Sequence, residues 1–246
     1  MSVEPAYDPS RSAVAFPEGY DRHFWHQARL RLVIGALRRH GSSRVLDIGC
    51  GPGAYVRALR AEGYDAVGCD PGHAGIPTLA PGHVFTGRSL DQMDEGDLAI
   101  VDTALLLDVI EHLADPAAFL DHVRRRLPRL RALVLTVPAR RELWSALDHA
   151  AGHHRRYTRA SLREVLGESG FVVSELTYAF RLLYLPALAL AWTPRRRRVV
   201  APARPRLHDW VGRLLAAERR VLPNGWPGTS LLCVASPASP ARGAAS

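Results

Sequence analysis

The chain has 246 residues, which suits one α/β domain with additions and allows a full hydrophobic core. Its 47% hydrophobic and 23% charged residues are ordinary for a soluble globular protein. The formal net charge is +8 at pH 7, yet the chain contains no lysine, so arginine supplies all 32 of the strongly basic residues. Schiff-base and amine-nucleophile chemistry of lysine is therefore excluded. The same bias weakens any argument from basic charge toward nucleic acid.

Three further features bear on the compartment. Cys50, Cys69 and Cys233 lie far apart without a Cys-x-x-Cys pair, which indicates reduced thiols rather than a disulfide framework. Residues 1–19 are polar and proline-rich without the apolar core of a signal peptide, so we expect a flexible segment. The longest apolar stretch, 182–192, contains a proline and is too short to cross a bilayer. Together these features predict a cytoplasmic protein.

The first predicted elements surround a glycine-rich loop. Residues 20–40 have the spacing of an amphipathic helix that ends at Gly41. Residues 44–55 (RVLDIGCGPGAY) begin with a short apolar run typical of a buried parallel strand and then place glycines at 49, 51 and 53. Glycine allows positive φ and close approach to a ligand. A helical pattern follows at once, so the loop should lie where open α/β sheets bind ligands.

The spacing in this loop discriminates between ligands. Gly53 follows Gly51 by two residues, whereas a dinucleotide-binding loop would need three, and no Lys-Ser/Thr pair of a P-loop is present. A second strand over 66–70 ends in Asp70, seventeen residues after Gly53, near the distance expected for a ribose-binding carboxylate. A carboxylate can accept from both ribose hydroxyls. A glycine-rich turn without a ligand is the alternative.

The D-x-G-x-G-x-G loop resembles motif I of class I S-adenosylmethionine (SAM) methyltransferases. The run LDVIEHLADPAAFL, after a fourth strand over 102–108, is similar to the corresponding segment of ubiquinone-type small-molecule methyltransferases. The resemblance implies SAM as cofactor and S-adenosylhomocysteine as product. An acidic turn usual in the family after strand three is replaced here, so we expect the adenine contact from the residues that follow this strand. The cofactor contacts implied are Asp47, Gly49, Cys50, Gly51, Gly53, Asp70, Pro71, Ser89, Leu90, Asp108 and Val109.

The resemblance and the remaining pattern predict an α/β fold. We expect a Rossmann-like, seven-stranded, mostly parallel sheet with helices on both faces and a helical insertion before the last strand. The methyltransferase domain should run from 20 to 235, with the insertion at 179–222 lying over the substrate cleft and a disordered tail at 236–246. The other predicted strands cover 83–86, 131–138, 171–178 and 229–235. Predicted helices begin near Asp115-Pro116 and at Thr158 or Ser161.

Histidines are the candidates for a general base. Methyl transfer from a sulfonium is an in-line displacement that requires no metal, and a neutral acceptor must lose a proton. The pKa of histidine lies near working pH. His112 follows strand four, and His149 and His153 follow strand five, so all three should reach the same sheet edge; His153 is the first choice. Capping or packing roles are the alternatives. His149 and His153 have metal-pair spacing, but no H-E-x-x-H pattern accompanies them, and no metal is predicted.

Candidates for substrate contact come from two segments. Trp25, with Arg29, lies on the leading helix and is a candidate lid residue. Arg155 and Arg156 suit an anionic group on the acceptor, and Tyr157 belongs to the same segment; a salt bridge at a helix start is the alternative for the arginines. The run 195–198 beside the apolar stretch could meet an anionic membrane surface or RNA phosphate, or be a solvated loop.

The predicted function is methyl transfer from SAM to a small-molecule acceptor, at oxygen, with a histidine base. The acceptor could be anionic or lipid-like, and peripheral membrane contact is compatible with the apolar insertion. An RNA methyltransferase is the first alternative, although no RNA-binding module accompanies the basic charge. A methyltransferase-like binding protein without catalysis is the second. The sequence predicts neither the acceptor's identity nor the oligomeric state.

Overall fold

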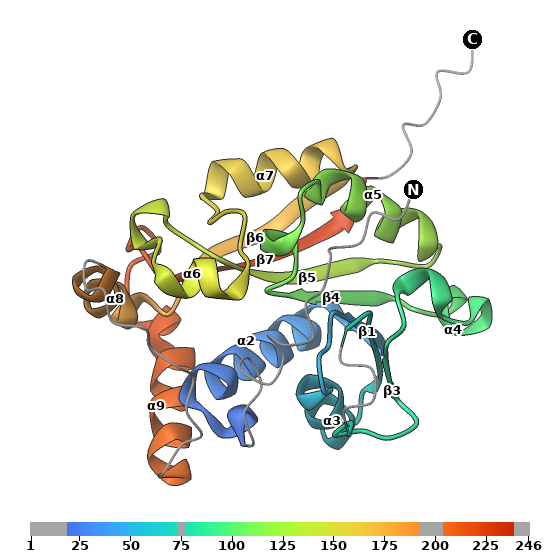
Figure 1. The fold of residues 1–246 in the computed structure, drawn as a ribbon, viewed down its shortest axis with the longest axis horizontal. Helices are drawn as coiled ribbons and strands as arrows, with labels where there is room; N and C mark the ends of the chain where they lie inside the picture. Colours follow the sequence, from blue (N-terminus) through green and yellow to red (C-terminus); the bar gives the residue numbers. More distant parts are fainter. Residues whose placement is uncertain (1–18, 73–76, 192–203, 239–246) are drawn as a thin grey trace.

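A computed structural model describes residues 19–72, 77–191 and 204–238 (Figure 1). Seven strands form one sheet in the order β3-β2-β1-β4-β5-β7-β6. The first five pair in parallel, and β7 runs antiparallel between β5 and β6. The strands are β1 (Arg44–Ile48), β2 (Asp65–Asp70), β3 (Val84–Thr86), β4 (Thr103–Leu107), β5 (Ala132–Pro138), β6 (Phe171–Ala179) and β7 (Ser230–Pro237). The predicted seven-stranded, mostly parallel α/β fold is confirmed.

The strand order creates a crevice between β1 and β4. From β1 the chain moves outward to β2 and β3, then crosses back so that β4 pairs with the other side of β1. The loops that leave the carboxyl ends of β1 and β4 therefore diverge, which is the ligand-binding position of open α/β sheets. All five residues of β4 are buried, as expected for a strand covered on both faces.

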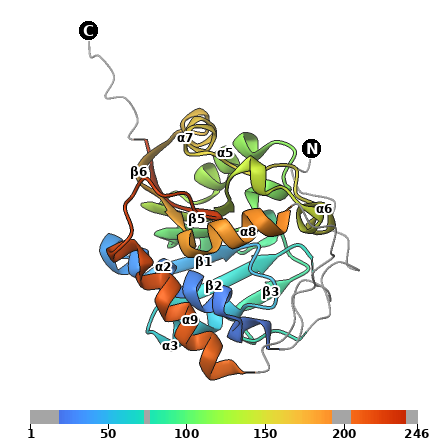
Figure 2. The ribbon, with the colours of Figure 1, turned by 90° about the vertical axis from the view of Figure 1, so that its left-hand side faces the viewer.

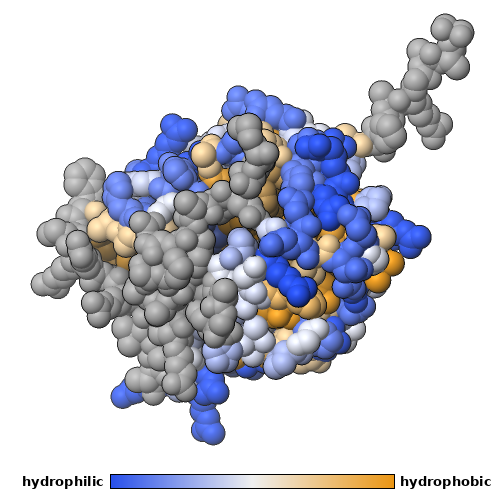
Figure 3. Space-filling view, turned by 45° about the vertical axis from the view of Figure 1, so that its right-hand side comes forward, coloured by the Kyte–Doolittle hydropathy of each residue, from blue (hydrophilic) through white to orange (hydrophobic). Residues whose placement is uncertain are grey.

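Helices cover both faces of the sheet (Figures 1 and 2). On one face lie α2 (Phe24–His40) and α3 (Ala54–Ala61), whose apolar sides share a core with strand residues such as Val45 and Leu105. The opposite face carries α4 (Glu95–Ala99), α5 (Pro116–Arg126) and α7 (Arg159–Glu168). The face drawn in Figure 3 is hydrophilic with apolar areas between, which is ordinary for a folded domain.

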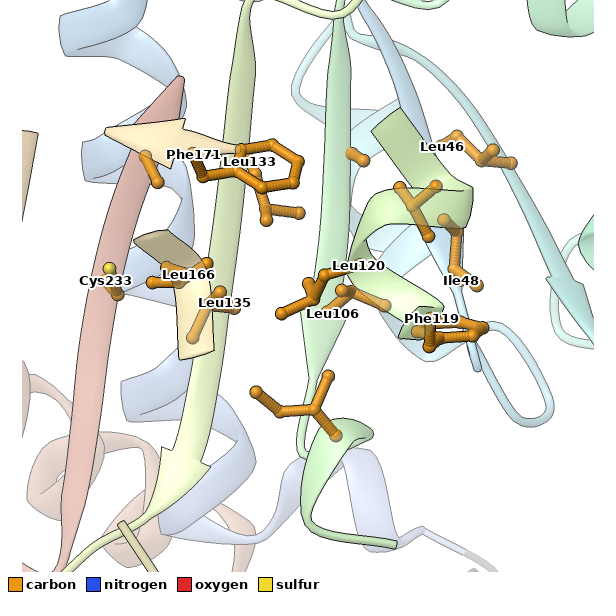
Figure 4. Close-up of a cluster of buried hydrophobic side chains, with 14 of the residues drawn as sticks. Leu46, Ile48, Leu106, Phe119, Leu120, Leu133, Leu135, Leu166, Phe171 and Cys233 are labelled. Atoms are coloured by element: carbon orange, nitrogen blue, oxygen red, sulfur yellow. The ribbon is translucent and has the colours of Figure 1, made fainter. Parts of the chain in front are cut away.

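The core under α5 and α7 fixes these helices on the sheet. Figure 4 shows Leu120 of α5 beside Leu106 of β4, and Leu166 of α7 beside Leu135 of β5. All four side chains are fully buried, and burying each contributes roughly 1.5–3 kcal/mol. No disulfide joins the described cysteines, which are all buried. The fold therefore rests on apolar burial.

Local sequence signals set the helix ends. The Asp115 side chain accepts from Ala118 N at 3.0 Å, and Pro116 occupies the first turn, so α5 begins where predicted. Thr158 caps α7 in a reciprocal capping box with Ser161. The leading helix begins later than predicted, because a 3₁₀ turn over Tyr20–Arg22 precedes α2 and His23 caps it.

The insertion between β6 and β7 contains α8 (Tyr184–Ala191) and α9 (Pro205–Ala217). Helix α9 packs against α2 where Gly212 leaves no side chain: a Cβ there would lie 2.9 Å from Gln27 Cβ. Helix α8 lies beside α6 (Ala146–Ala151) in Figures 1 and 2, and Tyr184 donates to Glu142 at 2.9 Å. None of the helices in the described part of the chain is long and apolar enough to cross a bilayer.

Several predictions fall on residues outside the described ranges. These are the N-terminal segment 1–18, the arginine run 195–198 and the last eight residues, 239–246. At the C-terminus the predicted boundary at residue 236 was wrong, since β7 extends through Pro237 by pairing with β6. The placement of the insertion over a substrate cleft stays a prediction.

Candidate active site

The glycine-rich loop after β1 has the conformation that its glycines permit. Gly49, Gly51 and Gly53 have φ of +78°, +53° and +88°. A Cβ on Gly53 would lie 2.4 Å from Val84 Cγ2, and one on Gly49 would lie 2.8 Å from Val109 Cγ2. Side chains at these two positions would therefore displace neighbouring strands or loops as well as strain the backbone. The glycines therefore let the backbone of this loop lie at the carboxyl end of β1 without a Cβ that would block a ligand.

Asp70 joins this loop to the end of β2. It is 7% exposed, its Oδ2 accepts from Gly51 N at 2.8 Å, and its Oδ1 accepts from Gly72 N at 2.8 Å. Pro71 is exposed beside it. Cys50 is buried within the loop, and burial raises the pKa of its thiol. The predicted ribose carboxylate thus lies directly against the glycine-rich loop.

The turn after β3 lies next to Asp70, because Arg88 N donates to Asp70 O at 3.1 Å. Ser89 caps a 3₁₀ turn over Leu90–Gln92, with Ser89 N donating to Gln92 Oε1 at 2.8 Å. Leu90 is buried in the core. The adenine contact through Ser89 and Leu90 stays a prediction.

Asp47 is a buried carboxylate without a described partner. It is 1% exposed at the end of β1, and neither carboxylate oxygen has a hydrogen-bond partner among the described residues. Burial raises its pKa to about 7, although Arg29 lowers it. Burial of an unpaired charge is costly. These oxygens are therefore suited to accept from a cationic or hydrogen-bond-donating ligand.

Arg29 of α2 lies beside Asp47 and Asp108. Its guanidinium carbon is 4.2 Å from the Trp25 ring centroid and 4.9 Å from the Tyr55 centroid, and Nε donates to Tyr55 Oη at 2.5 Å. It forms an ion pair with Asp108. Burial lowers the pKa of the Arg29 guanidinium, but Tyr55 and Asp108 raise it by more, so the net shift is upward. The sequence placed Arg29 only in a lid, whereas here it is 5% exposed within the site.

Asp108 follows β4 in an uncommon conformation, with φ +59°. Its N donates to Thr136 O at 2.9 Å, and its Oδ1 accepts from Thr136 Oγ1 at 3.0 Å. Val109 then packs against Gly49. Strained residues persist where the surroundings determine them, and they concentrate at functional sites.

A cluster of Glu111, His112 and His153 lies just beyond Asp108. One ligand-type atom from each residue lies within 4.8 Å of the other two. The rings of His112 and His153 meet edge to face, with centroids 4.8 Å apart. Burial, followed by His153, lowers the pKa of His112 to about 4. Burial raises the pKa of Glu111, which is 0% exposed and which the sequence analysis did not single out.

Asp148 of α6 orients His153. The His153 Nδ1 lies 2.8 Å from Asp148 Oδ1, while Arg156 contacts both Asp148 oxygens at 2.8 and 3.0 Å. Burial raises the pKa of the Asp148 carboxyl, but the hydrogen bonds from His153 and Arg156 outweigh burial and lower this pKa to about 2. An ionised carboxylate can only accept, so Nδ1 of His153 donates to Asp148 and the other ring nitrogen, Nε2, is left for other contacts.

The other predicted substrate residues contact the protein itself. Arg156 also donates to Ala139 O at 3.1 Å, and Arg155 donates to Leu113 O and Ala114 O at 3.0 and 2.8 Å. Tyr157 is 2% exposed and donates to Ile110 O at 3.2 Å. These bonds hold the loops that carry the cluster. Contact of Trp25, Arg155, Arg156 and Tyr157 with an acceptor stays a prediction.

His149 lies apart from this cluster. It is exposed on α6, where its Nε2 accepts from Trp144 Nε1 at 2.8 Å. Its predicted role as a base has no contact to support it in the described residues.

A family profile described as a methyltransferase domain matches residues 18–176. The chain belongs to this methyltransferase family. It is 30% identical over 177 residues to the ubiquinone biosynthesis O-methyltransferase of Azorhizobium caulinodans, a match covering 63% of this chain and 66% of that protein. A shorter match, 36% identical over 90 residues, to the protein of that name from Cereibacter sphaeroides covers 36% of its length. The chain thus spans between about a third and two thirds of these relatives.

Solved methyltransferases share the fold at low sequence identity. The plantazolicin methyltransferase BpumL has a TM-score of 0.58 at 14% identity, over 94% of this chain and 92% of that one. The methyltransferase domain of bacterial CtHen1-C has a TM-score of 0.56 at 16% identity, over 87% and 99%. The predicted class I methyltransferase fold is confirmed.

Proposed function

We propose that this methyltransferase-family chain transfers the methyl group of SAM to an oxygen of a small-molecule acceptor. The observation that carries the proposal is a juxtaposition at one sheet edge. The glycine-rich loop follows Asp47 at the end of β1, and Glu111 and His112 follow β4, the neighbour of β1 in the sheet. His153, from the segment after α6, joins Glu111 and His112 there. Val109 packs against Gly49 and joins the two segments.

The charged residues at this edge match the polar groups of SAM. Asp47 can accept from the α-ammonium group, and the fork of Arg29 suits the α-carboxylate. Asp70, hydrogen-bonded to the glycine-rich loop, is the proposed partner of the ribose hydroxyls. Asp47, whose oxygens have no hydrogen-bond partner in the described residues, would then gain one on binding.

The acceptor oxygen attacks the methyl carbon while the carbon–sulfur bond breaks and its electron pair goes to sulfur. A neutral hydroxyl must also lose its proton, and the cluster after β4 is the proposed place of that loss. His153 is better suited than His112, because Asp148 fixes its tautomer. The similarity to ubiquinone biosynthesis O-methyltransferases supports oxygen as the target.

Calorimetry with S-adenosylhomocysteine tests the cofactor site. We expect saturable binding to the unaltered chain and at least a tenfold loss in Gly53→Ala, whose Cβ would meet Val84. Gly167→Ala is the matched control, because a Cβ at that helical position meets nothing within 4 Å. No binding to the folded, unaltered chain would refute the proposal. Release of S-adenosylhomocysteine in the presence of hydroxylated aromatic acceptors then tests the transfer itself.

A further inference from the structure

We infer that a hollow beside the edge strand β6 binds a small molecule through its phosphate group. None of the described residues that line this hollow belongs to the cofactor edge at β1 and β4. The hollow is therefore a second site, independent of the proposed function.

The hollow lies at the end of the sheet. β6 is the last strand in the order, and its outer edge pairs with no further strand within the described ranges. Residues 174–177 of β6 line a hollow of about 550 Å³, together with Arg39, Arg159, Arg219 and Asn224. Small-molecule sites commonly enclose about 300–1,000 Å³. Since one water molecule takes up about 30 Å³ in the liquid, the hollow has room for a phosphate and an organic group attached to it.

Three arginines reach the hollow from three separate elements. Arg39 lies near the end of α2, Arg159 begins α7, and Arg219 belongs to a 3₁₀ turn over Glu218–Arg220 that follows α9. Because α2 and α7 cover opposite faces of the sheet, these side chains meet around its edge. Glu175 is the one acid among the described lining residues, so the hollow carries a net charge of +2.

Glu175 pairs with two of these arginines and is ionised. It accepts from Arg39 Nη2 at 2.8 Å and also pairs with Arg219. Burial raises the pKa of Glu175, but the hydrogen bonds from Arg39 and Arg219 outweigh burial and hold this pKa below its ordinary value. A guanidinium has five N–H donors, and Glu175 accepts only from Nη2 of each. Two arginines that share one carboxylate therefore retain charge and donors for a second anion.

Arg159 has no acidic partner within the described ranges. Its Nη2 donates to the backbone oxygen of Asn224 at 2.7 Å, and its Nε is buried without a hydrogen-bond partner there. Its guanidinium carbon lies 4.5 Å from the centroid of the Tyr178 ring. Stacking on an aromatic ring fixes the plane of a guanidinium and so orients its donors. An anion in the hollow would supply the negative partner that Arg159 lacks.

Arg181 adds positive charge next to the lining. It is 3% exposed, and its Nη2 donates to Thr177 Oγ1, part of the lining, at 3.0 Å. Burial lowers the pKa of this guanidinium, and the neighbouring charges of Arg219 and Arg159 lower it too, although Glu218 raises it. The arginines around the hollow are thus close enough to repel one another, and an anion between them would relieve that repulsion.

The charge and the donors favour phosphate over carboxylate. A phosphate monoester carries about −1.5 to −2 charges at pH 7, which matches the net charge of the hollow. Its three terminal oxygens can accept from several arginine forks at once, whereas a carboxylate has two oxygens in one plane. Arginines that converge from three directions therefore suit the tetrahedral group better.

Calorimetry with the full chain and inorganic pyrophosphate tests the site. We expect saturable binding of about one pyrophosphate per chain, with Arg39→Gln and Arg159→Gln each weakening it at least fivefold. Glu175→Gln should strengthen binding about threefold, because it removes a negative charge from the hollow. Arg38→Gln is the matched control, since Arg38 is the neighbour of Arg39 on α2 but is exposed and pairs with Glu62 outside the hollow. Unchanged circular dichroism spectra establish that these variants are folded.

Two further ligands separate phosphate from other anions. Succinate, a dicarboxylate, should bind at least tenfold more weakly than pyrophosphate, and a short single-stranded RNA should bind no more tightly. Tighter RNA binding that Arg159→Gln weakens would assign the site to a nucleic-acid backbone and overturn the inference of a small molecule. Absence of pyrophosphate binding to the unaltered chain, equal binding of succinate, or unchanged binding in Arg39→Gln and Arg159→Gln would also overturn it. None of these outcomes bears on binding of S-adenosylhomocysteine at β1 and β4.

Discussion

Two regions of the molecule differ in whether their buried acids have hydrogen-bond partners. Glu218, at the end of the insertion, is 1% exposed and accepts from Arg181 N at 2.7 Å and from Leu182 N at 3.1 Å. Asp47 and Glu111 at the β1–β4 edge are as deeply buried and have no hydrogen-bond partner in the described residues.

The difference teaches where a ligand belongs. The fold supplies partners for an acid whose role is structural, and natural structures leave few buried polar groups unsatisfied. Asp47 on β1 and Glu111 in the turn after β4 therefore mark the β1–β4 edge as the place where other molecules complete the hydrogen bonding. The comparison predicts opposite effects when each kind of acid is neutralised.

Removing the partnered acid should have the largest effect on stability. Glu218→Ala leaves the buried N–H of Arg181 and the partly buried N–H of Leu182 without acceptors. We expect the free energy of unfolding to fall by about 2–4 kcal/mol. Guanidinium denaturation followed by circular dichroism measures it. An effect below about 1 kcal/mol would mean that the backbone at 181 and 182 finds other partners, and the contrast between the two regions would fail.

Neutralising Asp47 should act in the opposite direction in the cofactor-free chain. Its folded-state pKa of about 7 lies above the ordinary 3.8, so the folded chain binds this proton more tightly. Stability from this group is present below pH 4 and is lost as pH rises toward 7. Asp47→Asn should therefore stabilise the chain at pH 8, by on the order of 2 kcal/mol. Equal destabilisation at pH 5 and pH 8 would contradict this explanation.

The same carboxylate should make cofactor binding depend on pH. If the ionised form of Asp47 accepts from the α-ammonium group, affinity for S-adenosylhomocysteine should rise about tenfold from pH 6 to pH 8. Calorimetry in buffers of different ionisation enthalpy would also detect the proton released at pH 6. Asp47→Asn should bind more weakly and lose this slope; a slope that survives the substitution would assign it to another group.

The smallest effect is expected at Glu175 on β6, a partly exposed acid with two partners. It pairs with Arg39 at 2.8 Å and also with Arg219. Glu175→Gln should cost less than about 1 kcal/mol, and the cost should shrink in high salt. A larger loss, insensitive to salt, would show that this pair is more than a surface contact.

The sequence predicted the parts of the fold and site that local patterns encode. Strand positions agree to within one or two residues, because each is a short apolar run bounded by turn residues. The glycine spacing and Asp70 identified the loop and the acid that the structure joins by a hydrogen bond. The capping signals at Asp115 and Thr158 were also readable, since a cap involves neighbours three residues apart.

Tertiary contacts decided what the sequence analysis missed. Glu111 stands beside His112 in the quoted run, but its burial and lack of partners depend on the loop after β5. Asp148 looked like an ordinary helical acid until the chain brought His153 and Arg156 to it. Arg29 lies on a helix whose spacing fixes its burial, yet only the packing of α2 on the sheet places it beside Asp108.

The packing of α9 on α2 has a consequence for protein engineering. Gly212 fits against the backbone of α2, with a would-be Cβ 3.1 Å from Phe24 O, and Arg31 pairs with Asp209 one turn away. The helix that carries Arg29 is thereby attached to the insertion at a fixed point. An insertion transplanted from another family member would need an acid and a small residue at these two positions, three residues apart on one helix face. The remainder of the graft could then vary in length and chemistry without moving Arg29.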